Sequence, residues 1–155
     1  MKRLHIHVAV DDLEKSIGFY CTLFGAKPIK QKTDYAKWLL DDPRVNFAIS
    51  SRGAKSGLDH LGIQVDTPEE LEDLRENMKR ADLGVFDEGE TTCCYAKSDK
   101  SWLKDPSGIA WEAYHTMSDV EFFNEAPAKE GTTCCAPKVE AKPIAASCAP
   151  KSGCC

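Results

Sequence analysis

The chain has 155 residues, of which 42% are hydrophobic and 29% are charged, and its formal net charge is −5. This composition is typical of a soluble globular protein with one ordinary domain. The basic residues are scattered along an acidic chain, so we expect neither nucleic acid nor a membrane surface as a partner. No apolar run approaches the roughly 18 residues of a membrane helix, and we expect a cytoplasmic protein.

The first elements predicted are a strand at residues 4–10 and a helix. Apolar residues alternate in the strand with His5 and His7, which places both imidazoles on its second face. Asp11 is the predicted N-cap, because a glutamate follows it at capping-box spacing. The helix is predicted to end at Gly25, since glycine readily adopts the left-handed conformation.

The same order of elements recurs after residue 57. A second alternating strand carries His60, and Thr67 is predicted to cap a helix that ends near Gly84. The predicted buried stripe of this helix is Leu71, Leu74, Met78 and Ala81. The remaining predicted strands cover residues 36–40, 45–50, 93–97, 101–104 and 109–114. Strand, helix and strands therefore occur twice, and His5 and His60 meet only if the two copies pair around one cleft.

The composition changes near residue 126 to small and polar residues with cysteine. We predict a folded domain at 1–125, with modules at about 1–53 and 58–116, and a disordered cysteine-rich tail at 126–155. The chain has eight cysteines, which in a reducing compartment favour metal or redox chemistry over disulfides. The candidate metal-binding cysteines of the tail are Cys134, Cys135, Cys154 and Cys155.

Cys93 and Cys94 are adjacent, which disfavours a disulfide between them. Their Cα atoms are about 3.8 Å apart, below the usual range of about 4.4–6.8 Å. Two adjacent thiolates can instead hold one soft centre such as arsenic(III) or cadmium, although two packed thiols are the simpler interpretation. On a flat strand the two side chains would face opposite sides, so we expect a bend or mobile loop. Lys97, Lys100 or Lys104 could help to form the thiolate.

Glu112 is a candidate metal ligand on the last predicted strand. It shares a strand face with Ala110 and Tyr114, while the more apolar opposite face, with Trp111, is expected to pack on a helix. Glu112 is therefore expected to face the cleft. Two imidazoles and one carboxylate form a facial triad typical of non-haem iron(II), although zinc accepts the same ligands.

The segments HIHVAVDDLEKSIGFYCTLFG, DHLGIQV and KDPSGIAWEAY resemble the vicinal oxygen chelate superfamily of glyoxalases, ring-cleaving dioxygenases and fosfomycin-resistance proteins. The resemblance implies an α+β fold in which two βαβββ modules form a half-open mixed β-sheet barrel around a metal site. The superfamily's metal ligands match His5, His60 and Glu112. Four-ligand members also use an acidic residue where this chain has Asn-Phe-Ala-Ile at 46–49, and its loss favours more open coordination.

The segments TTCCYAKSDKSWLKDPSG and TTCCAPK resemble the carbon–arsenic lyases and the cadmium-induced proteins. This resemblance implies an iron(II)-dependent dioxygenase, with dioxygen as co-substrate, that cleaves the carbon–arsenic bond of trivalent methyl or aromatic arsenicals and releases arsenite. Cys93 and Cys94 would bind the arsenic. The alternatives are a thiol-based cadmium or arsenite sequestration protein and another superfamily enzyme, such as a metal-dependent thiol transferase. A homodimer is a further expectation.

The remaining histidines, cysteines and large aromatic residues receive structural interpretations. His7 shares a face with His5 and is expected to support the site or to pack beside it, whereas His115 is expected to be structural. Cys21 is interpreted as a small core residue of the first helix. Trp38, Phe47, Trp102 and Trp111 are assigned to the core, with one of them a candidate for lining an aromatic-substrate pocket.

Overall fold

The computed structural model describes residues 2–81 and 84–121, and the predicted tail at 126–155 lies outside them. The first copy of the repeated unit contains β1 (Arg3–Ala9), α1 (Leu13–Phe24), β2 (Lys30–Lys32), β3 (Tyr35–Asp41) and β4 (Arg44–Ser50). The second contains β5 (Gly57–Val65), α2 (Pro68–Ala81), β6 (Phe86–Cys93), β7 (Ala96–Lys104) and β8 (Ala110–Asp119). Each copy therefore has the predicted order βαβββ.

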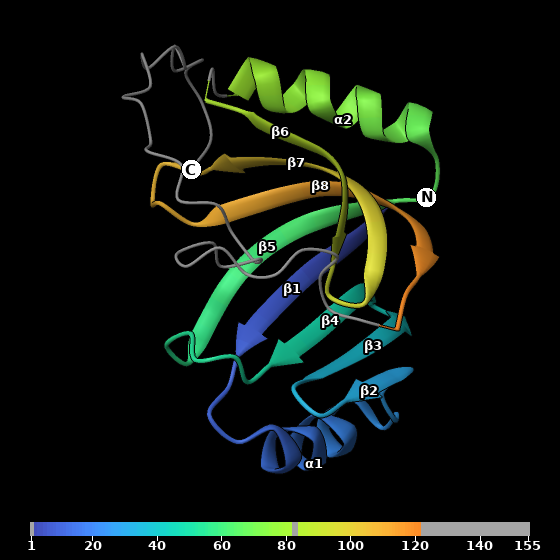
Figure 1. The fold of residues 1–155 in the computed structure, drawn as a ribbon, viewed down its shortest axis with the longest axis vertical. Coiled ribbons are helices and arrows are strands. Elements are labelled where there is room, and N and C mark those ends of the chain that lie inside the picture. Colours follow the sequence, from blue (N-terminus) through green and yellow to red (C-terminus); the bar gives the residue numbers. More distant parts are fainter. Residues whose placement is uncertain (1, 82–83, 122–155) are drawn as a thin grey trace, which may run out of the picture.

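All strands belong to one 8-stranded sheet with the order β2-β3-β4-β1-β5-β8-β7-β6. The copies join through the antiparallel pair of β1 and β5, and each of these strands is parallel to the last strand of its own copy, β4 or β8. The sheet curls, with α1 and α2 at its opposite ends (Figure 1). This half-open mixed sheet with two helices confirms the predicted fold class.

Each helix covers a separate apolar core. Under α1 the buried residues are Leu13, Ala36, Trp38, Phe47 and Ile49, and Cys21 packs against them as predicted. Under α2 they are Val65, Leu71, Leu74, Met78 and Ala113. Because side chains alternate along a strand, the faces opposite these cores are turned toward the middle of the curled sheet. Polar residues on those faces therefore meet in one cleft.

The structure confirms the predicted caps Thr67 and Gly25 and corrects two other predictions about the helices. The N-cap of α1 is Asp12, whose carboxylate accepts a hydrogen bond from Lys15 N at 2.9 Å, and Gly25 closes the helix with φ 61°. The prediction of Asp11 was wrong, since the helix begins one residue later. Thr67 caps α2 as predicted, whereas Ala81 is exposed because it ends the helix. Within residues 2–81 and 84–121, neither helix is long and apolar enough to cross a membrane.

The largest difference between prediction and structure lies at the cysteine pair. The strand predicted at 93–97 is instead the end of β6, a two-residue turn at Cys94 and Tyr95, and the start of β7. Both turn residues have positive φ, 57° and 61°, as type I′ hairpin turns require. A bend at the cysteine pair was expected from the opposed strand faces, but no local signal located the turn, because it lacks the usual glycine or asparagine. The sequence prediction also missed the three-residue strand β2 and residues 86–92 of β6.

Candidate metal centre and thiol pair

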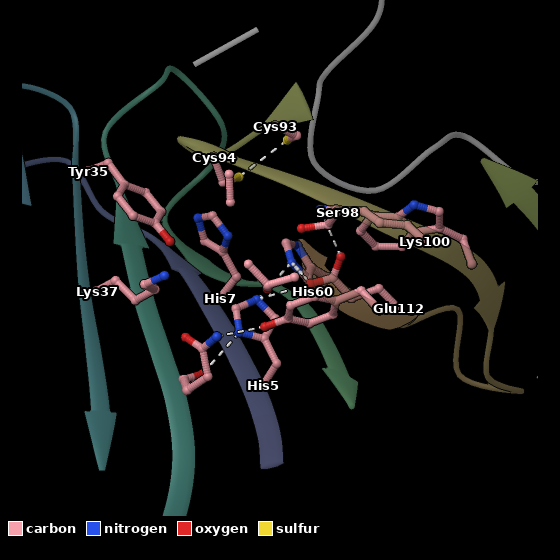
Figure 2. Close-up of a pocket in the computed structure, with 15 residues that line it drawn as sticks. His5, His7, Tyr35, Lys37, His60, Cys93, Cys94, Ser98, Lys100 and Glu112 are labelled. Carbon is pink, nitrogen blue, oxygen red and sulfur yellow. Dashed lines mark hydrogen bonds and ion pairs between the residues drawn. The ribbon is translucent and has the colours of Figure 1, made fainter. Parts of the chain in front are cut away.

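His5, His60 and Glu112 come from β1, β5 and β8, which are neighbouring strands at the centre of the sheet. His5 Nε2 is 3.2 Å from His60 Nε2 and 3.3 Å from Glu112 Oε1, and His60 Nε2 is 3.5 Å from Glu112 Oε1. All three side chains are buried and point toward one another (Figure 2). The structure thus brings together the three residues that the sequence singled out as metal ligands.

The spacing of these donor atoms fits one shared cation. Two atoms about 2.1 Å from an ion lie about 3.0 Å apart at a right angle and about 3.4 Å apart in a tetrahedron. The observed separations of 3.2, 3.3 and 3.5 Å are close to both values. Two imidazole nitrogens and a carboxylate oxygen also form a donor set suited to a divalent transition metal with open positions. The residues present therefore fit a metal ion, in either geometry.

Hydrogen bonds orient both imidazoles with Nε2 toward the centre. His5 Nδ1 donates to the Asn46 carbonyl at 3.0 Å, which leaves the Nε2 lone pair available, and burial lowers the pKa of His5 to about 4. His60 Nδ1 lies 2.5 Å from the Asp59 carboxylate. Burial alone would lower the pKa of His60, but Asp59 and Glu112 raise it to about 9. A partner on the second nitrogen is the usual way to orient a metal-binding histidine.

Glu112 has one carboxylate oxygen for the centre and one for Lys100. Oε1 faces both histidines, while Oε2 accepts a hydrogen bond from the Lys100 ammonium at 3.2 Å. Burial by itself would raise the pKa of Glu112, but the Lys100 charge and the His60 ring hold it well below its usual value. Glu112 is thus an ionised, oriented carboxylate. Asp59 and Lys100 are supporting residues that periodicity could not identify.

His7 provides a third imidazole beside the first two. His5, His7 and His60 each offer a nitrogen within 4.8 Å of the others, so these three residues could also hold a metal ion. His7 Nε2, however, is 2.8 Å from the Ser50 hydroxyl, and burial lowers the pKa of His7 to about 3. This neutral, hydrogen-bonded ring agrees with the expectation that His7 supports or packs beside the centre.

The thiols of Cys93 and Cys94 lie on the same side of the hairpin turn, with their sulfurs 3.3 Å apart. Two bonds of about 2.3 Å from one atom, the length of a zinc–sulfur bond, place their ends about 3.3 Å apart at a right angle. The pair can therefore bind one thiophilic atom with two sulfurs. The expected bend is present, and it solves the problem that adjacent strand residues face opposite sides.

Contacts from the first copy anchor the turn. The Tyr95 hydroxyl donates to Asp34 at 2.7 Å, and Asp34 also accepts a hydrogen bond from Arg52 at 2.8 Å. The Lys30 ammonium donates to the Tyr95 carbonyl at 2.8 Å. These contacts join elements 61 and 65 residues apart in the sequence and hold the thiols over the cleft.

The candidate metal ligands and both thiols line one cavity (Figure 2). Of the four large aromatic residues assigned to the core, Trp102 lines this cavity, and its ring lies edge-on to His60 with ring centroids 5.2 Å apart. Trp38 and Phe47 are core residues, as predicted. The free space in this cavity is about 30 Å³, room for about one water molecule, so an aromatic ligand fits only if lining side chains rearrange.

The comparisons with known proteins agree with this fold. Residues 2–113 match the family model described as the Glyoxalase/Bleomycin resistance protein/Dioxygenase superfamily. The chain belongs to this superfamily. Among solved structures, a superfamily member from Vibrio splendidus 12B01 is similar with a TM-score of 0.53 and 15% identity, over 76% of this chain and 100% of that one. Homoprotocatechuate 2,3-dioxygenase from Brevibacterium fuscum is similar with a TM-score of 0.55 and 20% identity, over 77% and 38% of the chains.

Several curated proteins are similar to this chain in sequence over most of their length. The chain is 42% identical to the trivalent organoarsenical cleaving enzyme of Bacillus sp. (strain MD1), covering 100% of this chain and 99% of that one. It is 33% identical to the enzyme of the same name from Thermomonospora curvata, over 89% and 91% of the chains. It is also 35% identical to the cadmium-induced protein CadI of Mycobacterium tuberculosis (strain H37Rv), over 86% and 88%.

Proposed function

We propose that the protein is an iron(II)-dependent dioxygenase that cleaves the carbon–arsenic bond of trivalent organoarsenicals and releases arsenite. The observation that carries the proposal is the shared cavity, in which a thiol pair spaced for one arsenic atom faces two histidines and a carboxylate spaced for one metal ion. The names of the curated relatives support the same reaction. The dioxygenase structures support the fold alone.

In this proposal Cys93 and Cys94 bind the substrate covalently and position it. Each thiol gives its proton to a hydroxyl of the trivalent arsenical, so two arsenic–sulfur bonds form and two water molecules leave. The Lys100 ammonium interacts electrostatically with both sulfurs from the same cavity. The turn then holds the arsenic-bearing carbon in the cleft. A step between two separate molecules thereby becomes a reaction between groups held in one site.

His5, His60 and Glu112 would hold the metal. Iron(II) bound there would supply open coordination positions and electrons for the activation of dioxygen. The imidazoles keep their Nε2 atoms toward the centre through Asn46 and Asp59. The expected organic product is oxygenated at the carbon that carried arsenic.

Anaerobic reconstitution with iron(II), followed by addition of dioxygen and a trivalent arylarsenical, tests the proposal. We expect arsenite release that requires both iron and dioxygen. Cys94→Ser should abolish tight arsenical binding and leave iron bound, while Cys21→Ser, a matched thiol substitution in the α1 core, should retain both. Iron binding without arsenite release from the wild-type protein would refute the proposed reaction.

The rival function is sequestration of cadmium or arsenite by thiols. The resemblance to CadI and the cysteines beyond residue 126 favour it, although those cysteines lie outside the described residues. Removal of residues 126–155 separates the two functions. Sequestration should be lost with the tail, whereas cleavage should largely survive because its residues lie between His5 and Glu112.

A further inference from the structure

One wall of the cavity is formed by Tyr35 and Lys37 of β3. The two residues are two positions apart in the strand, so their side chains share a face, and their polar ends point into the cavity (Figure 2). Tyr35 is 3% exposed and Lys37 is half-buried. Neither side chain belongs to the metal triad or the thiol pair.

The charge of Lys37 is only partly offset within the described part of the chain, because the Asp119 carboxylate acts on it electrostatically without forming a direct ion pair with it. Among residues 2–81 and 84–121, Lys37 has no ion pair, whereas Lys30 pairs with Asp119 and the buried Lys100 with Glu112. Burial and the neighbouring Lys30 ammonium lower the pKa of Lys37. A partly buried ammonium without a direct ion pair is costly, and an anionic ligand group reduces that cost.

Tyr35 adds a neutral hydrogen-bond donor to this wall. Burial raises the pKa of Tyr35 well above its ordinary value, so the hydroxyl keeps its proton. Its ring lies 5.8 Å from the ring of Tyr95, which belongs to the thiol-bearing turn. An ammonium and a phenol on one strand face form a donor pair suited to a carboxylate, sulfonate or phenolate.

This wall lies within reach of a group bound to the thiols. The Cys94 thiol interacts electrostatically with both Lys37 and Tyr35. An organic group attached to arsenic at Cys94 therefore extends from a point close to this wall. Lys100 also lines the cavity, but its ammonium is taken by Glu112.

We propose that Tyr35 and Lys37 form a subsite for an anionic substituent on the organic group of the arsenical. The protein then prefers arylarsenicals that carry a carboxylate, sulfonate or phenolate over uncharged ones. This inference rests on the proposed function for the identity of the substrate. Its measurable consequence is a binding preference, which does not depend on cleavage.

The test measures the dissociation constants of phenylarsine oxide and 4-carboxyphenylarsine oxide by calorimetry, with the full chain kept anaerobic. Wild-type protein should bind the carboxylated probe about 10-fold or more tightly. Lys37→Met should remove this preference, and Tyr35→Phe should reduce it about 5-fold. Lys79→Met, which removes an exposed lysine of α2, should keep it.

Each outcome bears on one of the two proposals. No preference in the wild-type protein, or an equal loss of affinity for both probes in Lys37→Met, overturns the subsite, since the second result would place Lys37 in support of the thiols. Retention of the preference in Lys37→Met overturns it as well. A preference that depends on Lys37 without any arsenite release supports the subsite and refutes the proposed reaction.

Discussion

Gly62 tests whether the central strands determine the position of Glu112. Gly62 on β5 pairs directly with Glu112 on β8. A Cβ atom at Gly62 would lie 2.6 Å from Glu112 Cγ and 2.7 Å from the Glu112 carbonyl oxygen, whereas ordinary contacts begin at 3.4 Å. Gly62→Ala therefore requires Glu112 and its backbone to move by about 0.8 Å. Overpacking of this kind costs about 2 kcal/mol and lowers Tm by about 6 °C in a chain of this size.

The same displacement should weaken the metal site. Ligand distances vary by only about 0.2 Å in working sites, so a shift of about 0.8 Å should reduce iron(II) affinity by about 10- to 100-fold. Competition with a fluorescent chelator measures affinity, and thermal unfolding measures Tm. Gly18→Ala is the control, because nothing lies within 4 Å of its Cβ position in α1 and alanine favours the helix. Unchanged iron affinity in Gly62→Ala would refute the reasoning.

Three further substitutions test the remaining supports of the site. Asp59→Asn weakens the orientation of His60 and should lower iron(II) affinity about 10-fold by chelator competition; equal affinity would assign Asp59 no role. His7→Gln should retain iron stoichiometry by metal analysis, whereas loss of iron would favour the three-histidine group over the triad with the carboxylate. Tyr95→Phe removes the hydrogen bond to Asp34 and should speed reaction of the thiols with a bulky disulfide about 10-fold. An unchanged rate would show that this contact does not hold the turn closed.

The helices and the central strands could be predicted because capping residues and apolar alternation within each element indicate its type and its ends. Thr67 begins α2 and Gly25 ends α1 through side-chain and backbone effects confined to one turn. The alternation around His5 and His60 marks the half-buried strands β1 and β5. These signals need no information about distant parts of the chain, and their main error was one residue at a helix end.

The thiol turn could not be predicted in this way because distant residues stabilise it. Cys94 and Tyr95 adopt positive φ, which is unfavourable for both residue types. Hydrogen bonds from Tyr95 to Asp34 and from Lys30 to Tyr95 offset that cost, and both partners lie more than 60 residues away. The positions of Asp59 and Lys100 beside the site likewise follow from side-chain packing rather than periodicity.

The two copies also explain why the triad has one carboxylate. Equivalent positions of the two copies are 55 residues apart, as His5 and His60 show. The helix caps Asp12 and Thr67 have the same separation. The position in the second copy that is equivalent to His7 is therefore Gly62. His7 pairs with Ala48 on β4, and Gly62 pairs with Glu112 on β8, so Ala48 is the counterpart of Glu112.

In each pair one residue is small and the other is large, but the order is reversed: the large residue is His7 on β1 in the first copy and Glu112 on β8 in the second. In the second copy, Gly62 leaves room for the carboxylate of Glu112. In the first copy, Ala48 is fully buried and packs in a cluster with Tyr35 and Tyr95. The first copy therefore has no carboxylate at the position that matches Glu112, and Ala48 lies there beside Tyr35 of β3 and the thiol-bearing turn.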